Sequence, residues 1–364
     1  MGVIRMGRWR PASGWRLLAA LPLLAPATAL AVDWDVYGRL NLSIERYGGG
    51  GYDAWDLASN SSRLGFDVEH QLETGLTVLG EVEQQIAFNR GDGLEWASRS
   101  ALLGLRDSWG TLRLGYMNSA VKDLRGRFDL FSGEMGDSRN ILRGEHKPHF
   151  DSRFPAGVRL TTPEGEGWGF DLHYSFDTQD EDDDPPADDN ERQAYAAVVD
   201  YQWPALRLAF GTERFFGEDD DDEGEAFRLG AEWVIGDDWT LIGFGQRSKE
   251  AWEVAGDEYE DADGYGFGAR YRLADDLELR GQYYAIDVDE SGHGGRMAVI
   301  GAVFHADERT RLYVTYANLN NDSDSQLVPW YHGRVAGPEG NEDRVDLDAG
   351  SSTWAVASGV RVDF

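Results

Sequence analysis

The sequence predicts an all-β fold, a sixteen-stranded antiparallel transmembrane β-barrel, and three observations carry this prediction. Short stretches in which apolar and polar residues alternate follow one another through most of the chain, as in strands with one apolar and one polar face. Short and long connections alternate strictly between these stretches. No apolar stretch long enough for a membrane-spanning helix follows residue 31, which excludes a helical membrane protein.

The first 31 residues have the pattern of a secretory signal peptide and not of a folded element. Four arginines precede an apolar run over 17–24, and Ala29-Leu30-Ala31 forms a small-residue cleavage motif. We therefore expect a signal peptide over 1–31 and one exported domain over 32–364. The chain has no cysteine, so it does not depend on disulfides in an oxidising compartment.

Sixteen candidate strands follow in the exported domain. Their centres lie near residues 39, 67, 82, 102, 113, 159, 172, 198, 209, 230, 243, 268, 282, 300, 315 and 358. The long connections are expected over 47–60, 89–96, 117–150, 178–192, 216–224, 250–261, 289–294 and 321–350. Seven short turns separate them, as sixteen antiparallel strands with both chain ends on one side require. Outer-membrane barrels have short periplasmic turns and longer external loops.

The last strand shows the alternation most clearly. Trp354, Val356, Val360, Val362 and Phe364 share one parity, while the polar residues near the end share the other. A terminal aromatic residue on the apolar face resembles the closing strand of an outer-membrane barrel, so Phe364 is the predicted barrel-closing residue. A soluble all-β fold remains the alternative, but it gives less reason for loop lengths to sort by side.

The charge of the chain restricts its partners. A formal net charge of −32 argues against nucleic-acid binding, which needs a basic surface. The carboxylates cluster between the predicted strands, where solvated external loops account for most of them and a divalent-cation site is the alternative. The histidines are scattered and no nucleophile motif is present, so we predict no cofactor, no metal site and no enzyme.

Several segments then resemble one known family. They are Val36 to Leu40, Ser62 to Phe66, Trp109 to Gly115, Gly157 to Pro163 and Val360 to Phe364. Their order and spacing resemble the sixteen-stranded, trimeric general porins of Gram-negative outer membranes. The resemblance implies a homotrimer in contact with outer-membrane lipid and lipopolysaccharide. It also implies a water-filled channel for passive diffusion of small hydrophilic solutes and ions.

In that family the third external loop folds into the barrel and narrows the pore. The corresponding segment here is 117–150, whose stretch from Asp129 to Glu134 resembles the acidic-aromatic-glycine stretch of the family. We expect four carboxylates on the acidic side of the constriction. These are Asp123, Asp129, Glu134 and Asp137.

The opposite wall of the constriction is expected to be basic. The parity of Arg39, Arg63 and Arg159 is opposite to that of neighbouring apolar residues, which turns these side chains into the lumen. Arg113 points inward by the same rule, and Arg99 joins them although the alternation after it is blurred. Tyr116 stands where the family commonly has an arginine, so the ion preference stays open; the acidic loops favour cations at the entrance.

Three other functions stay open from the sequence. A substrate-specific porin needs a basic ladder or an aromatic track along one wall. An enzyme in an outer-membrane barrel needs a Ser and His pair on adjacent strands, and none is convincing. An acidic calcium-binding β protein predicts release without detergent and metal-dependent folding.

Overall fold

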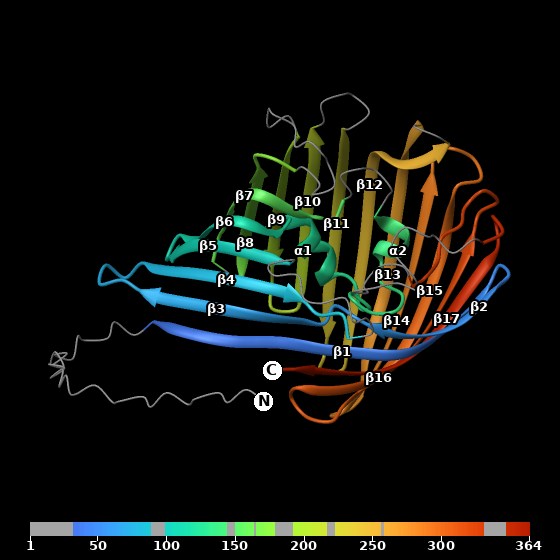
Figure 1. The fold of residues 1–364 in the computed structure, drawn as a ribbon, viewed down its shortest axis with the longest axis horizontal. Helices are drawn as coiled ribbons and strands as arrows, with labels where there is room; N and C mark the ends of the chain where they lie inside the picture. Colours follow the sequence, from blue (N-terminus) through green and yellow to red (C-terminus); the bar gives the residue numbers. More distant parts are fainter. Residues whose placement is uncertain are drawn as a thin grey trace, which may run out of the picture.

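A computed structural model describes the fold of residues 32–88, 99–143, 150–163, 165–178, 192–216, 223–255, 258–330 and 347–364. Strands dominate, and two short helices lie in the third connection (Figure 1). The predicted signal peptide and most of the acidic clusters lie outside the described residues. Within the described part, no helix is long and apolar enough to cross a membrane.

The elements follow the alternating stretches of the sequence. They are β1 (Asp33–Gly49), β2 (Tyr52–Ser59), β3 (Arg63–Gln71), β4 (Thr77–Gln85), β5 (Ser100–Asp107), β6 (Gly110–Asn118), α1 (Ala120–Arg127), α2 (Arg139–Leu142), β7 (Arg153–Thr161), β8 (Gly167–Ser175), β9 (Gln193–Gln202), β10 (Leu206–Phe216), β11 (Gly224–Ile235), β12 (Trp239–Ala255), β13 (Glu258–Ala274), β14 (Leu277–Val288), β15 (Gly294–His305), β16 (Thr310–Asn321) and β17 (Ser352–Asp363).

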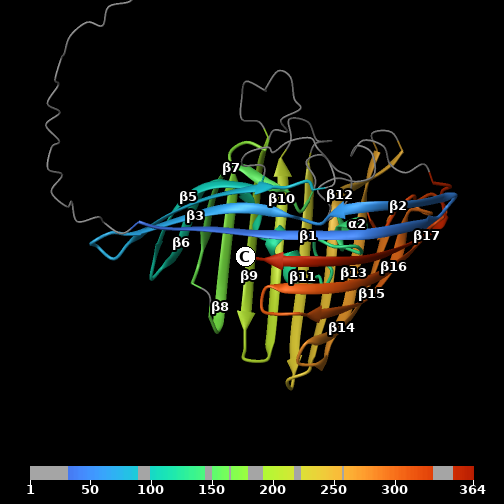
Figure 2. The same cartoon turned by 60° about the horizontal axis from the view of Figure 1, so that its bottom comes forward.

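The strands form one closed antiparallel barrel. Each strand pairs with its neighbours in chain order, and β17 pairs with β1 to close the wall (Figure 2). β2 and β3 both pair with β1 and occupy a single position in the wall, so the seventeen strands make sixteen positions. The break lies at 60–62, where Ser61 has a positive φ of 51°. The predicted sixteen-stranded barrel is confirmed.

The alternation places apolar residues on the outside of the barrel. Leu103, Leu229, Phe267 and Ile300 are each at least 60% exposed, although each lies well inside a regular strand. In a chain that folds around its own core such residues are buried, whereas a barrel in lipid carries them on its outer face. Tryptophans beside the short turns are exposed as well, as expected for an interfacial aromatic belt. These are Trp109, Trp168, Trp203 and Trp239.

Two of the predicted long loops are shorter than expected. The first hairpin turns at Gly50 and Gly51, both with positive φ, and β2 occupies most of the segment expected as a loop. Likewise β12 continues to Ala255 and β13 begins at Glu258. In β2 the alternation continues, with Trp55 and Leu57 exposed on the outer face, so the segment expected as a loop extends the barrel wall.

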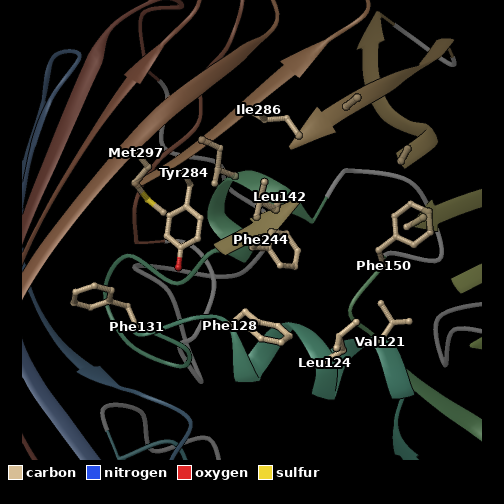
Figure 3. Close-up of a cluster of buried hydrophobic side chains, with 14 of the residues drawn as sticks. Val121, Leu124, Phe128, Phe131, Leu142, Phe150, Phe244, Tyr284, Ile286 and Met297 are labelled. Atoms are coloured by element: carbon tan, nitrogen blue, oxygen red, sulfur yellow. The ribbon is translucent and has the colours of Figure 1, made fainter. Parts of the chain in front are cut away.

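The third loop lies inside the barrel. Helix α1 contacts β9, β10 and β11, and α2 contacts β14 and β15. The main apolar core is the junction between this loop and the wall. There Val121, Leu124 and Phe128 of the α1 segment and Leu142 of α2 form one buried cluster with wall residues such as Phe244 and Ile286 (Figure 3). The predicted inward-folded third loop is confirmed, and its core explains why it stays against one side of the barrel.

Small residues in the wall make room for the helix. A Cβ added at Gly230 of β11 would lie 2.2 Å from the Phe128 ring, and one at Gly211 of β10 would lie 2.7 Å from Leu124. Ala196 and Ala209 are buried on the same inner face. The wall is therefore shaped to accept α1 closely.

Candidate functional site

Because the third loop covers most of the β9–β15 side, the open part of the lumen lies mainly against β3–β8, together with part of β9 and β10. A cavity of about 670 Å³ occupies this space, bounded on one side by α1. Its lining carries seven arginines and six carboxylates. They are Arg63, Arg99, Arg106, Arg113, Arg127, Arg159 and Arg207, and Glu81, Glu83, Asp107, Asp123, Asp171 and Asp200. Four of the five predicted wall arginines thus lie together, while Arg39 lies outside the lining.

Two of the wall arginines share one carboxylate. Glu83 on β4 pairs with Arg63 of β3, whose Nε lies 3.1 Å away, and with Arg99, the residue before β5, whose Nε lies 2.5 Å away. All three side chains are mostly covered, with 12–22% of their surface exposed. One carboxylate between two guanidinium groups leaves this part of the wall with a net positive charge.

The wall and the third loop meet at Arg159. Its guanidinium pairs with Asp171 on β8 at 2.5 Å and with Asp123 of α1 at 2.8 Å, and it donates to the backbone oxygen of Asn118 at 2.9 Å. Asp123 keeps 37% of its side chain exposed and lines the cavity. The basic wall and the acidic loop are therefore in direct contact here, and Arg159 also anchors the loop.

Arg113 lies directly opposite Arg159 in the register of β6 and β7. It donates to Thr161 Oγ1 at 2.7 Å. Among the residues that the structure describes, no carboxylate forms an ion pair with it. Arg113 is therefore a half-buried wall arginine whose charge is not matched by a direct partner.

The other predicted loop carboxylates do not face the lumen. Asp129 and Asp137 expose 1% and 0% of their side chains and both pair with Arg125 Nη1, at 2.7 and 3.2 Å. Asp129 also accepts from Tyr284 of β14, and Asp137 pairs with Arg139. The prediction that these two charges line the constriction is wrong, because both carboxylates turn into the loop and pair with arginines of the loop itself.

Glu134 is likewise turned away from the cavity. Its side chain is 3% exposed and pairs with Arg280 of β14, whose guanidinium lies 4.5 Å from the centre of the Phe131 ring. This pair attaches the tip of the loop to the wall. Of the four predicted acidic residues, Asp123 alone lines the cavity described here.

The pKa values of two buried carboxyl groups in the loop are shifted from their usual range. Burial by itself favours a neutral Asp137, but Arg139 and Arg125 outweigh it and keep the pKa of Asp137 well below its usual range. For Asp129, burial and the neighbouring charge of Asp137 raise the pKa above its usual value. The loop therefore keeps a charged Asp137 at neutral pH through its two arginines.

The far end of the third loop is fixed by a pair that the sequence did not indicate. Asp151, with a φ of 63°, receives both terminal nitrogens of Arg228 from β11, and both side chains are fully buried. Arg228 also donates from Nε to Gln246 on β12 at 2.7 Å. The sequence carries one signal for this contact: several inward positions on β9–β11 are small and apolar, as expected where another segment packs against the inner face of the wall.

The last external connection reaches the third loop as well. The backbone oxygen of Pro329 accepts from Gly136 N and from Asn140 Nδ2, both at 2.9 Å. Trp330 is 1% exposed and stacks on Tyr47 of β1 with ring centres 4.8 Å apart. This contact joins the loop to the wall near the β1–β2 hairpin, and no pattern in the sequence pointed to it.

Arg39 belongs to a second charged group at the end of the barrel where the short turns lie. Asp363 on β17 accepts from Arg39 Nε at 2.8 Å, from Arg361 Nε at 2.9 Å and from Arg311 Nη2 at 3.0 Å. Phe364 lies on the opposite parity and is 45% exposed. Its backbone nitrogen donates to Gly38 O at 3.1 Å and its oxygen accepts from Gly38 N at 2.9 Å, at the seam between β17 and β1.

No group of three or more His, Asp or Glu side chains in the described residues has the arrangement of a metal site. The histidine pair at 146 and 149 and most of the acidic clusters lie outside these residues. The divalent-cation alternative for the external loops therefore stays a prediction.

The chain is similar to known outer-membrane proteins. A family model described as Gram-negative porin matches residues 17–324. The major outer membrane protein P.IB of Neisseria meningitidis serogroup B is 26% identical over 170 residues, which cover 44% of this chain and 49% of that protein. P.IB of Neisseria gonorrhoeae is 23% identical over 172 residues. The chain thus spans about half the length of the curated relatives it matches.

Solved structures match over more of the chain. An anion-selective porin from Comamonas acidovorans superposes with a TM-score of 0.75 and 22% identity, covering 92% of this chain and 100% of that one. The trimer form of OmpT from Vibrio cholerae gives a TM-score of 0.64 with 17% identity and the same coverage. At these identities the likeness concerns the fold.

Proposed function

This chain belongs to the Gram-negative porin family, which places it in the outer membrane, and from that premise we propose that it forms a water-filled channel. The channel carries small hydrophilic solutes and ions by passive diffusion and catalyses no reaction. The observation that carries the proposal is the charged cavity between α1 and the β3–β8 wall, inside a barrel with an apolar outer face. A loop fixed by buried ion pairs keeps this opening at constant width.

We propose that ion preference has two opposing sources. The cavity lining carries one more arginine than it has carboxylates, and Arg113 has no direct carboxylate partner among the described residues. The whole chain, in contrast, has a formal net charge of −32 with many carboxylates in the external connections. A negative entrance enriches cations at low salt, whereas a Debye length of about 3 Å at 1 M salt screens that distant field. Cation preference should therefore weaken as salt increases.

We also propose that the protein forms a homotrimer, as OmpT of Vibrio cholerae does in its trimer form. The seam strands offer a suitable outer face, because exposed apolar side chains lie together on β1, β2 and β17. These are Ile44, Leu57, Val356 and Val360. The remaining outer surface then contacts outer-membrane lipid and lipopolysaccharide.

The test is conductance across a planar bilayer with detergent-purified protein. Stepwise openings, and a reversal potential that moves toward anions as both salt concentrations rise at a fixed gradient, would support the proposal. Openings in groups of three would support the trimer. A folded, heat-modifiable protein that leaves the bilayer silent would overturn the channel, and a reversal potential independent of salt would overturn the two-source account.

A further inference from the structure

Three arginines converge on one carboxylate at the seam of the barrel. Arg311 on β16, Arg361 on β17 and Arg39 on β1 all donate to Asp363, at 2.8–3.0 Å. All four side chains have the inward parity of their strands and keep 12–34% of their surface exposed. The group is therefore on the lumen wall and accessible to water.

The cluster carries more positive charge and more donors than Asp363 can satisfy. Each guanidinium uses one of its nitrogens on this carboxylate, although each has five N–H groups to donate. In the part of the chain that the structure describes, none of the three has another ion pair or hydrogen bond to a side chain. The three guanidinium groups and Asp363 together have a formal charge of +2, and each guanidinium side chain keeps part of its surface, 12–30%, exposed.

The strand register concentrates this charge at an energetic cost. Arg311 lies directly opposite Arg361, and Arg39 lies directly opposite Arg63. Like charges opposite each other on neighbouring strands destabilise a sheet. Binding Asp363 alone would need one arginine, so the structural role of that carboxylate does not account for three.

We propose that Arg39, Arg311 and Arg361 form a binding site for the carboxylate or phosphate group of a small anionic solute. Asp363 orients the three guanidinium groups by holding one nitrogen of each, and the free nitrogens then donate to the oxygens of the anion in the fork geometry that arginine favours. None of the three lines the cavity beside α1, although Arg39 lies opposite Arg63, which does, so this site adjoins that cavity without being part of its lining. The inference rests on the proposed channel for access to its ligand.

Inorganic phosphate is the probe, added to the channel in a bilayer with potassium chloride. We expect phosphate to reduce the unit chloride current in a saturable manner. The double variant R311Q/R361Q should need about tenfold more phosphate or greater for half-maximal reduction, because charge-assisted hydrogen bonds are lost. R247Q is the matched control, since Arg247 pairs with Asp261, Asp263 and Asp289 away from the seam. It should leave the phosphate effect unchanged.

The outcomes separate this site from the channel itself. A wild-type channel that conducts without responding to phosphate, or a double variant with unaltered response, overturns the site and leaves the channel standing. If the bilayer stays silent, phosphate titration of the detergent-folded protein by calorimetry still tests the site, and equal heats for wild type and variant overturn it. R311K/R361K, which keeps the charge, guards against misfolding: it should restore part of the response, and heat-modifiability reports the folded barrel.

Discussion

Arg113 and Arg159 face each other across β6 and β7, yet carboxylates hold only Arg159. The two residues have the same parity and the same predicted role, but Asp123 and Asp171 neutralise one of them and anchor it to α1. The other keeps its charge beside Thr161. The wall therefore divides its arginines between fixing the loop and setting the field in the lumen.

Replacing Arg113 should change selectivity without loosening the loop. R113Q should raise the ratio of cation to anion permeability by up to about fivefold, which shifts the reversal potential toward cations. A unit charge at about 4 Å in water contributes about 1 kcal/mol, which corresponds to such a factor. R159Q should instead increase the open-channel noise, because Asp123 loses its ion pair with the wall and keeps only its hydrogen bond from Asn118. Reversal potentials and current noise of the two variants, recorded side by side, test this division. Equal effects of both changes on noise would contradict it.

A larger side chain on the wall beneath α1 should displace the third loop and change the constriction. G230V places side-chain atoms where the Phe128 ring lies 2.2 Å from the Cβ position, so overpacking of about 1–3 kcal/mol is expected. G243V is the control, because nothing lies within 4 Å of its Cβ position. Unit conductance should change in G230V and not in G243V. An unaltered conductance in G230V would mean that α1 does not depend on this contact.

The buried ion pairs of Asp137 with Arg125 and Arg139 predict that the loop responds to pH. A carboxyl whose pKa is lowered in the folded protein stabilises it above its ordinary pKa of about 4, and this contribution is lost as the pH falls through the lowered value. The wild-type channel should therefore become noisier only below about pH 4. D137N should be noisy already at pH 7, where it leaves Arg125 and Arg139 without that charge. Identical noise for both proteins at pH 7 would rule out this role.

The alternation of residues along the strands predicts much of the fold, but it does not predict the positions of the third-loop carboxylates. Alternation identifies the inward face of Arg63, Arg113 and Arg159, because a strand fixes the side on which each side chain lies. It does not show how a loop folds on itself, so the sequence predicts a lumen position for Asp129 and Asp137, although both residues are buried. Only tertiary packing brings Arg125 between them.

Contacts between distant segments were also hidden from the sequence. Asp363 and Arg39 are separated by almost the whole domain and meet because the barrel closes with a particular register between β17 and β1. Asp151 and Arg228 meet because the third loop crosses the lumen. Small inward residues such as Gly211 and Gly230 did carry a signal, since a water-facing wall has no need of them.

The terminal aromatic residue offers a test of barrel closure. F364A keeps the backbone bonds to Gly38, whereas deletion of Phe364 removes both. We expect the deletion to reduce the yield of folded protein in the membrane more than F364A does. F364W, which keeps an aromatic ring at the seam, should assemble nearly as well as the wild type. Membrane yield and heat-modifiability measure all three, and normal assembly of the deletion variant would show that closure does not require the last residue.

The contact between Pro329 and the third loop predicts a second control over the constriction. Trp330 is buried against Tyr47, so W330A removes a large core side chain at a cost of about 3–5 kcal/mol and frees the segment whose backbone oxygen holds Gly136 and Asn140. The loop then keeps its attachment through Arg228 and Asp151 but loses the one beside β1. We expect unit conductance to rise and its fluctuations to grow, while R113Q and R159Q in the W330A background keep their separate effects. W55A is the control, because Trp55 is 68% exposed on the outer face of β2. A W330A channel as quiet as W55A would mean that the wall holds the loop without help from this contact.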